Sequence, residues 1–164
     1  MAKVEDMSDE DIRSVAAKLV VFGFDGADDE PPPHALRMIR KGCAGAILFG
    51  RNIKDPKQVQ SLCASLKRHS LPRKFVIMTD QEGGRVARLK PPFTAIPSPR
   101  VVASSRDSAQ AVGDIAKVMS RELRAVNIDM DLAPVVDVDT NPDNPVIGDR
   151  AFSSNAEEVG ILGR

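Results

Sequence analysis

The sequence predicts an α/β fold built on parallel strands. Two observations indicate this class: short, nearly continuous apolar runs recur along the chain, and segments with helical spacing of apolar residues lie between them. The length of 164 residues suits one ordinary domain. About four strand–helix units with right-handed crossovers are expected. A small doubly wound sheet and part of a (β/α)8 barrel both fit, because a complete barrel takes about 250 residues.

The first unit begins with a helix. Ser8 is followed by three acidic residues, the pattern of a helix N-cap with an acidic first turn. The apolar run 19–24 is the expected first strand, buried on both faces of the sheet. Prolines at 31–33 open a short helix that continues to Arg40, and Gly42 is placed to end it.

The second and third units repeat this alternation. The run 44–49 predicts a buried strand, and Asp55 with Pro56 predicts the start of a helix that carries four apolar residues at helical spacing. The run 75–79 is the third strand. Residues 80–99, rich in glycine and proline, form a loop longer than most strand–helix connections, which marks it as a functional candidate.

A long helix and a fourth strand continue the alternation. A long amphipathic helix is expected from Ser105 or Asp107 onward. Residues 130–138 predict the fourth strand, with a bulge or irregularity at Pro134, which lacks the N–H of a regular ladder. Asn155 caps a last short helix.

Composition excludes several classes of protein. Lys plus Arg and Asp plus Glu number 23 each, so no overall positive field attracts nucleic acid or anionic lipid. Trp and Tyr are absent, which removes the usual platforms for stacking single-stranded bases. No apolar run approaches the roughly 20 residues of a membrane helix, and the first 17 residues are acidic and lack a signal-peptide core. A soluble, cytoplasmic protein without nucleic-acid or membrane partners is expected.

Cysteine and histidine give no sign of a reactive or metal site. Cys43 and Cys63 lie 20 positions apart among apolar residues, which favours buried structural thiols. His34 and His69 have no obvious partners and are expected at the surface.

Polar residues gather where the third strand ends. In both candidate architectures, chemistry takes place at the carboxyl ends of parallel strands. Asp80 is the first polar residue after the third strand, and Asp137 lies near the end of the fourth. Residues 80–88 contain two acids, two arginines and the pair Gly83 and Gly84, which allows close approach to a ligand. An Asp beside an Arg can bind vicinal hydroxyl groups through hydrogen bonds, or the two can form a surface salt bridge around a turn.

A second charged cluster lies at 144–152, in a loop whose charges could simply be solvated. Just before it, residues 137–143 imitate the alternating oxygen ligands of a calcium loop. The imitation fails at Pro142, where glycine is needed, and at Gly148, where the bidentate glutamate is needed. No metal site is predicted. Phosphate-binding, dinucleotide-binding, serine-nucleophile and zinc-helix motifs are also absent.

Four motifs, taken in order, resemble the amino-terminal domain of glycoside hydrolase family 3, over about residues 12–164. The similarity is closest to the bacterial-type β-N-acetylhexosaminidases. The motifs are GAILFGRNI at 45–53, TDQEGGRVARL at 79–89 with FTAIPSP at 93–99, NIDMDLAPVVDV at 127–138, and NPVIGDRAF at 144–152.

The resemblance implies a (β/α)8 TIM barrel that removes terminal β-linked N-acetylglucosamine with retention, without metal or organic cofactor. Residues 1–164 are then a family 3 amino-terminal domain that is incomplete at its carboxyl end, the first half of the barrel. Asp80 matches the family's aspartate that holds sugar hydroxyls, and Arg88 and Arg150 match arginines that contact the sugar. The neighbouring acid Glu82 could be mistaken for the nucleophile, but the family pattern gives it no such role.

The catalytic groups of the family have no counterpart in this sequence. A Lys–His pair in a KHxPGxG-like motif, an acid/base histidine and a nucleophilic aspartate belong to later segments of the family pattern, and neither His34 nor His69 matches. No catalytic residue is assigned, and the chain is expected to be inactive alone. A non-catalytic α/β carbohydrate-binding protein is the alternative. An open half-barrel would also leave strand edges exposed, including Val135, Val136 and Val138, so self-association is expected.

Overall fold

The computed structural model describes residues 7–164, which divide into two compact units. The first unit extends to Met78 and includes Val126–Met130. The second comprises Thr79–Ala125 and Asp131–Arg164. The assignment of residues 1–164 to one domain stays a prediction.

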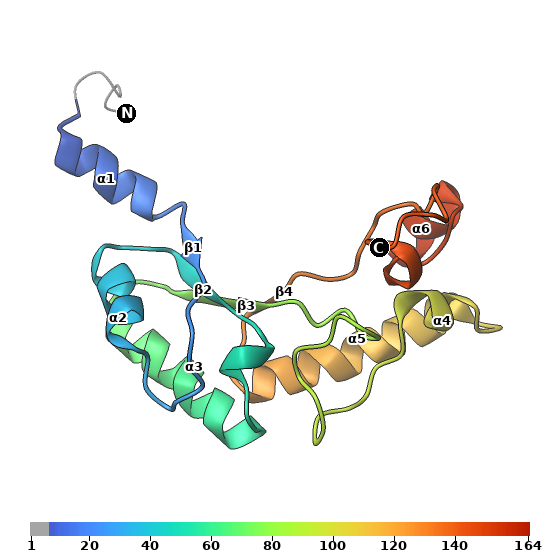
Figure 1. Cartoon of the computed structure of the whole chain (residues 1–164), viewed down its shortest axis with the longest axis horizontal. Helices are drawn as coiled ribbons and strands as arrows, with labels where there is room; N and C mark the ends of the chain where they lie inside the picture. Colours follow the sequence, from blue (N-terminus) through green and yellow to red (C-terminus); the bar gives the residue numbers. More distant parts are fainter. Residues whose placement is uncertain (1–6) are drawn as a thin grey trace. The chain divides into compact units, whose positions relative to one another are not determined.

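Four strands form one parallel sheet in the order β1-β2-β3-β4 (Figure 1). β1 pairs with β2 so that Val21 lies opposite Gly45. The spatial order follows the chain without reversal, as in a barrel, whereas a doubly wound sheet reverses at a switch point. This observation favours the barrel architecture of the two predicted. The strands are β1 (Val21–Phe22), β2 (Gly45–Leu48), β3 (Val76–Thr79) and β4 (Met130–Asp131).

The amino-terminal helix begins as predicted, but its surroundings differ from the prediction. In α1 (Asp9–Ala17) the Ser8 side chain accepts a hydrogen bond from the backbone N–H of Asp11, and the Asp11 carboxylate accepts from that of Ser8. No residue of α1 is buried. β1 has only two residues, of which Phe22 is buried and Val21 exposed. The prediction of a strand over 19–24 buried on both faces is therefore wrong: Phe22 and Phe24 are buried, whereas Val21 and the residues of the run before it are exposed, so only one face of this run is covered.

Two helices and alternate strand residues build the core of the first unit. α2 (Pro33–Arg40) packs against α3 (Pro56–Ser70). Gly42 follows α2 with a positive φ of 94°, as expected for a helix terminator. The buried side chains of this core include Ala35, Ile39, Ala46, Leu48, Val59, Leu62, Cys63, Leu66, Phe75 and Ile77.

The capping and burial of α3 confirm the prediction. The Asp55 carboxylate accepts a hydrogen bond from the backbone N–H of Gln58 at 2.9 Å. Cys43 and Cys63 are buried free thiols, as predicted. Burial raises the pKa of Cys63 to about 12, which keeps it as an unreactive thiol.

The turn after β2 carries a structural asparagine that the sequence analysis did not single out. Asn52 ends the 3₁₀ helix η2 (Gly50–Asn52) and is completely buried. Its amide donates to the carbonyls of Phe24 at 3.0 Å and Gly26 at 2.8 Å, and its Oδ1 accepts from the N–H of Phe49 at 2.9 Å. The motif GAILFGRNI thus ties the loop after β1 to the loop after β2.

Three helices and a 3₁₀ turn form the second unit. α4 (Pro99–Ala103) packs against α5 (Ser108–Ala125) and against η3 (Gly148–Arg150), and α5 also packs against α6 (Ala156–Leu162). As predicted, Asn155 caps α6, accepting from the N–H groups of the first turn. The buried cluster consists of Ala103, Phe152, Val159 and Leu162, with Val112 and Val138 packed against it. In α5 itself only Leu123 is buried, so most of its predicted apolar stripe lies partly exposed.

The fourth strand is shorter than the predicted span 130–138, which is wrong beyond Asp131. Pro134 has no N–H to continue a ladder, so pairing cannot run regularly through it. Beyond it, Val136 is exposed, while Val138 packs against the helical cluster. These residues are therefore not part of a strand edge.

None of the helices within residues 7–164 combines the length and hydropathy needed to cross a membrane. The cytoplasmic location expected from the sequence stays a prediction.

Candidate functional site

The loop after β3 brings two predicted site residues together. Asp80 directly follows β3, and the Arg88 guanidinium donates from Nη2 to Asp80 Oδ2 at 2.8 Å. The side chains of Arg88 and Asp80 are 27% and 20% exposed, so the pair lies at a partly shielded surface. Charge-assisted hydrogen bonds in such surroundings hold both side chains in defined orientations. The pair is thus more than a fully solvated salt bridge, and each partner keeps an accessible side.

Gln81 folds this loop back on itself. Its side chain is buried, and Oε1 accepts from the backbone N–H groups of Arg88 at 2.8 Å and Leu89 at 2.9 Å. Its own N–H donates to Asp131 Oδ1 at 2.8 Å. Gln81 therefore places Arg88 opposite Asp80, eight positions earlier. A glutamine among charged residues carries no distinctive signal in the sequence, so this role was not predicted.

The glycine pair permits close approach, but the chain itself fills the space. Gly83 and Gly84 have positive φ values of 95° and 55°. A Cβ on Gly83 would lie 2.3 Å from the carbonyl oxygen of Pro97, and one on Gly84 would lie 2.7 Å from the Ser98 side chain. The segment around Pro97 and Ser98 takes both Cβ positions, so the packing of the chain itself requires glycine here. The approach of a ligand to the pair stays a prediction.

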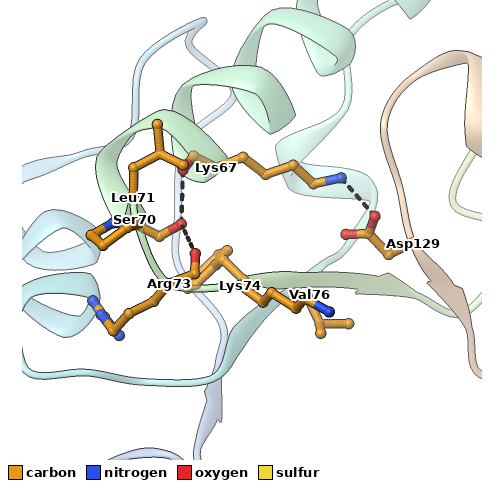
Figure 2. A pocket seen from close by; sticks show the side chains of 9 residues that line it. Lys67, Ser70, Leu71, Arg73, Lys74, Val76 and Asp129 are labelled. Carbon is orange, nitrogen blue, oxygen red and sulfur yellow. Dashed lines mark hydrogen bonds and ion pairs between the residues drawn. The ribbon is translucent and has the colours of Figure 1, made fainter.

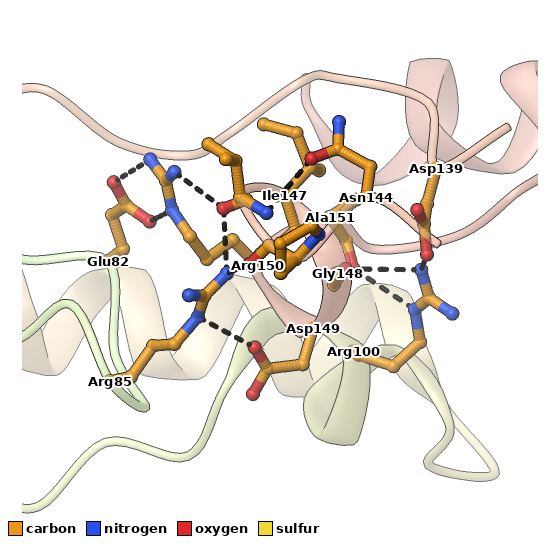
Figure 3. Close-up of polar contacts among 12 residues, drawn as sticks. Glu82, Arg85, Arg100, Asp139, Asn144, Ile147, Gly148, Asp149, Arg150 and Ala151 are labelled. Atoms are coloured by element: carbon orange, nitrogen blue, oxygen red, sulfur yellow. Dashed lines mark hydrogen bonds and ion pairs between the residues drawn. The ribbon is translucent and has the colours of Figure 1, made fainter. Parts of the chain in front are cut away.

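Arg150, the third predicted site residue, is held by Glu82. Its Nε donates to Glu82 Oε2 at 2.7 Å and its Nη2 to Oε1 at 2.8 Å, a bidentate pair (Figure 3). The Glu82 side chain is only 5% exposed. These hydrogen bonds raise the pKa of Arg150. Both oxygens of Glu82 are engaged, so it acts as a partner for Arg150 rather than as an accessible nucleophile.

Asp131 is a further acid of this region that the sequence analysis did not select. Burial, together with the charges of Asp80 and Glu82, raises its pKa to about 6, against the hydrogen bonds from the backbone of Gln81 and Leu132, which lower it. An acid whose pKa is raised in this way can hold a proton near neutral pH. The sequence feature that could have pointed to Asp131 is its position at the start of the predicted fourth strand, near whose end lies the more conspicuous Asp137.

The remaining sequence candidates make none of these hydrogen bonds, although the charge of Asp137 contributes to the raised pKa of Arg150. Asp137 is exposed, and Asp139 forms an ion pair with Arg100 at 2.8 Å. Within residues 7–164, no three metal-ligating side chains gather. His34 and His69 are exposed, as predicted.

The first unit contains a cavity of about 480 Å³ beside the amino end of β3 (Figure 2). Its polar groups already have partners: Lys67 Nζ lies 2.6 Å from Asp129 Oδ1, and the Ser70 hydroxyl donates to the carbonyls of Lys67 and Arg73. None of the predicted site residues lines it. The cavity is therefore explained by packing at the end of α3, and the second unit holds the candidate site.

Comparison with known proteins gives consistent matches. The family described as "Glycosyl hydrolase family 3 N terminal domain" matches residues 15–164. A β-hexosaminidase from Alkalilimnicola ehrlichii is 43% identical over 126 residues, covering 73% of this chain and 35% of that protein. One from Pseudomonas aeruginosa is 36% identical over 118 residues, covering 72% and 35%. The chain therefore spans about a third of the length of the curated relatives it matches.

Solved structures agree in fold. A family 3 β-N-acetylglucosaminidase from Paenibacillus matches with a TM-score of 0.87 and 35% identity, covering 93% of this chain and 29% of that one. NagZ from Neisseria gonorrhoeae in complex with N-trifluoroacetyl-D-glucosamine matches with a TM-score of 0.79 and 30% identity, covering 88% and 44%.

Proposed function

The chain belongs to glycosyl hydrolase family 3, and we propose that it forms the part of a β-N-acetylhexosaminidase that holds a terminal β-linked N-acetylglucosamine. Its fold class, part of a (β/α)8 barrel, is confirmed by the parallel sheet and the family match. By family the chain is a glycosidase, since its curated relatives are named β-hexosaminidases. The substrate and the roles of individual residues belong to the proposal.

The observation that carries the proposal is the pair of carboxylate–arginine contacts in the second unit, Asp80 with Arg88 and Glu82 with Arg150. A neutral polyol is recognised by oriented hydrogen bonds, and ionised partners strengthen them. In the proposed complex Asp80 accepts from sugar hydroxyls while Arg88 donates to sugar oxygens.

Arg150 has the donors for a second contact. Three of its N–H groups are engaged, two with Glu82 and one with the Val146 carbonyl at 3.2 Å. A guanidinium has about five N–H donors, so further donors remain for a sugar oxygen. Because Trp and Tyr are absent, polar contacts rather than ring stacking would supply recognition in this part of the site.

Catalysis with retention is part of the same proposal. It requires a nucleophile and a proton donor on opposite sides of the glycosidic bond. Asp80 and Glu82 are both engaged with arginines, so we assign them to sugar binding and to positioning. The nucleophile and the acid/base group are assigned to segments of the family pattern outside this sequence. No cofactor enters this chemistry.

Binding tests the proposal on the chain itself. The probe is N-trifluoroacetyl-D-glucosamine, whose fluorine resonance should broaden saturably on addition of the chain. Asp80→Asn should weaken binding about tenfold or more, since a charge-assisted acceptor is lost. Asp25→Asn is the matched control, because Asp25 also pairs with an arginine, Arg51, but is 88% exposed in the first unit. Equal binding by wild type and Asp80→Asn would refute the assignment.

Hydrolysis is the second test. The 164-residue chain alone should release no nitrophenol from an aryl N-acetyl-β-glucosaminide, because it supplies binding groups without the nucleophile. Residues 15–164 transplanted into the P. aeruginosa relative, in place of its matching segment, should restore turnover that Asp80→Asn then abolishes. A chimera that binds the probe without turnover would instead support the non-catalytic carbohydrate-binding alternative.

A further inference from the structure

Although its side chain is about half exposed, Arg85 makes several hydrogen bonds to one neighbouring turn. Its Nη2 donates to three successive backbone carbonyls, those of Pro145 at 2.9 Å, Val146 at 2.7 Å and Ile147 at 3.1 Å. Its Nε donates to Asp149 Oδ1 at 3.2 Å (Figure 3). One side chain therefore fixes the whole turn that leads into η3.

This Pro145–Ile147 turn also holds Arg150. The Val146 carbonyl accepts from both Arg85 Nη2 and Arg150 Nη1, so the two guanidinium groups share one oxygen. Glu82 holds the other edge of Arg150. Since Glu82 and Arg85 belong to the same loop, this loop fixes Arg150 directly through the carboxylate and indirectly through the turn.

Backbone hydrogen bonds make the loop rigid around Arg85. The N–H groups of Glu82 and Gly83 both donate to the Val86 carbonyl, at 2.9 and 3.2 Å, and the Val86 N–H donates back to Gly83. The N–H of Gly84 donates to the carbonyl of Ile96 at 2.9 Å. Arg85 thus projects from a closed turn anchored against the following chain, which limits how far its guanidinium can shift.

A third arginine secures the far end of the turn. Arg100 donates from Nε to the Ala151 carbonyl at 3.1 Å, from Nη2 to Asp139 at 2.8 Å, and to the Gly148 carbonyl at 3.4 Å (Figure 3). Backbone carbonyls from Pro145 to Ala151 are therefore held by side chains from two other segments. Such preorganisation lowers the entropy lost when a ligand is bound.

We propose that Arg85 is a positioning residue, which fixes the Pro145–Ile147 turn so that Arg150 is held ready to bind the sugar. The role of Arg150 toward the sugar rests on the proposed function, whereas the positioning of Arg150 by Arg85 does not. The ion pair between Arg85 and Asp149 is not the main source of this positioning, because the two side chains are 48% and 50% exposed. The three carbonyl contacts carry the positioning.

Two measurements test this on the chain. Nitrogen NMR of arginine side chains reports whether the Arg150 Nε–H is ordered, and fluorine NMR reports affinity for N-trifluoroacetyl-D-glucosamine. Arg85→Ala should broaden the Arg150 signal and weaken the probe about tenfold. Arg51→Ala is the matched control, because Arg51 is also half exposed and pairs with an aspartate in the first unit. It should change neither signal.

A double-mutant cycle separates positioning from direct contact. If Arg85 acts through Arg150, adding Arg85→Ala to Arg150→Ala should cause no further loss of affinity. Additive losses would overturn the proposal. Asp149→Asn should leave probe binding unchanged, whereas a loss equal to that of Arg85→Ala would assign the effect to the ion pair. Arg85→Lys should recover less than half of the loss, since an ammonium cannot reproduce the planar fork.

The two proposals can fail separately. If the wild-type chain does not bind the probe, the sugar-binding function fails, and the Arg150 Nε–H signal still decides the positioning role. An unchanged Arg150 signal in Arg85→Ala would refute positioning, whatever the probe shows. Should Arg85→Ala lower the melting temperature more than Arg51→Ala does, Arg85→Lys supplies the comparison in a folded protein.

Discussion

Asp131 illustrates how one carboxyl group links stability to pH. Burial, with the nearby charges of Asp80 and Glu82, raises its pKa from 3.8 to about 6. Between these two values the folded chain holds a proton that the unfolded chain has lost. The free energy of unfolding therefore falls as pH rises from about 4 to above 6, because the unfolded state binds fewer protons.

Replacing Asp131 should remove this loss of stability at high pH. At pH 8, Asp131→Asn should be more stable than wild type by about 1–2 kcal/mol, a value reduced for the partial exposure of the group. At pH 4 the two proteins should differ little. The asparagine oxygen can still accept the Gln81 N–H, so the hydrogen bond is kept. Urea denaturation at the two pH values measures the difference.

An exposed aspartate provides the comparison. Asp25→Asn replaces an 88% exposed side chain and should change the free energy of unfolding by less than about 0.5 kcal/mol at either pH. A pH dependence in Asp131→Asn equal to that of wild type would show that the carboxyl group is solvated in the folded chain and does not hold the extra proton.

At the scale of elements, helix starts and the two central strands were predictable, since the runs 44–49 and 75–79 match β2 and β3 closely, whereas the extents of the two outer strands were not. Ser8, Asp55 and Asn155 cap their helices as predicted, because a cap is a local hydrogen bond to the first turn. The predicted strand over 19–24 shrinks to two residues, and the one over 130–138 ends at Asp131. Strand length depends on which neighbour supplies partners, and apolar character alone does not reveal that neighbour.

The contact between β2 and β3 depends on one glycine. A Cβ on Gly45 would lie 2.1 Å from the backbone carbonyl oxygen of Val76, a contact that no side-chain movement can relieve. Gly45→Ala should therefore lower the free energy of unfolding by about 3 kcal/mol, since the paired strands would have to separate. Chemical denaturation of the purified variant measures this loss.

Gly113 serves as its control. It lies inside α5, and a Cβ there would meet nothing within 4 Å. Gly113→Ala should raise stability by about 0.5–1 kcal/mol, because alanine loses less backbone entropy in a helix. If both variants were equally stable, the strands would have to tolerate a wider spacing at Gly45 than the structure has.

At the scale of the whole molecule, long-range pairing explains what the sequence could and could not reveal about the site. Asp80 and Arg88 lie eight positions apart in one loop, so their proximity was predictable from the motif. Glu82 and Arg150 are separated by 68 positions, and charge alone does not indicate which acid an arginine meets across that distance. The sequence therefore supplied the candidate site residues, whose roles stay a prediction, while the partner of Arg150 emerged only from the fold.

The end strand β1 leads to a prediction about assembly. β1 is an edge strand of the sheet. In β1 and just before it, Leu19 is 84%, Val20 40% and Val21 36% exposed. An unpaired edge with apolar side chains is a template for pairing with another chain. We expect the 164-residue chain to self-associate through β1, with a sedimentation coefficient that rises with protein concentration.

Lysine on an edge strand discourages such pairing, because its charge would have to be desolvated between the chains. Val21→Lys should therefore increase the monomer fraction in sedimentation velocity, and the amide protons of β1 should exchange faster than in wild type. Val101→Lys, at a 59% exposed valine of α4, should leave both measurements unchanged. A wild-type chain that stays monomeric at every concentration, with β1 amides protected from exchange, would show that the chain covers this edge by itself.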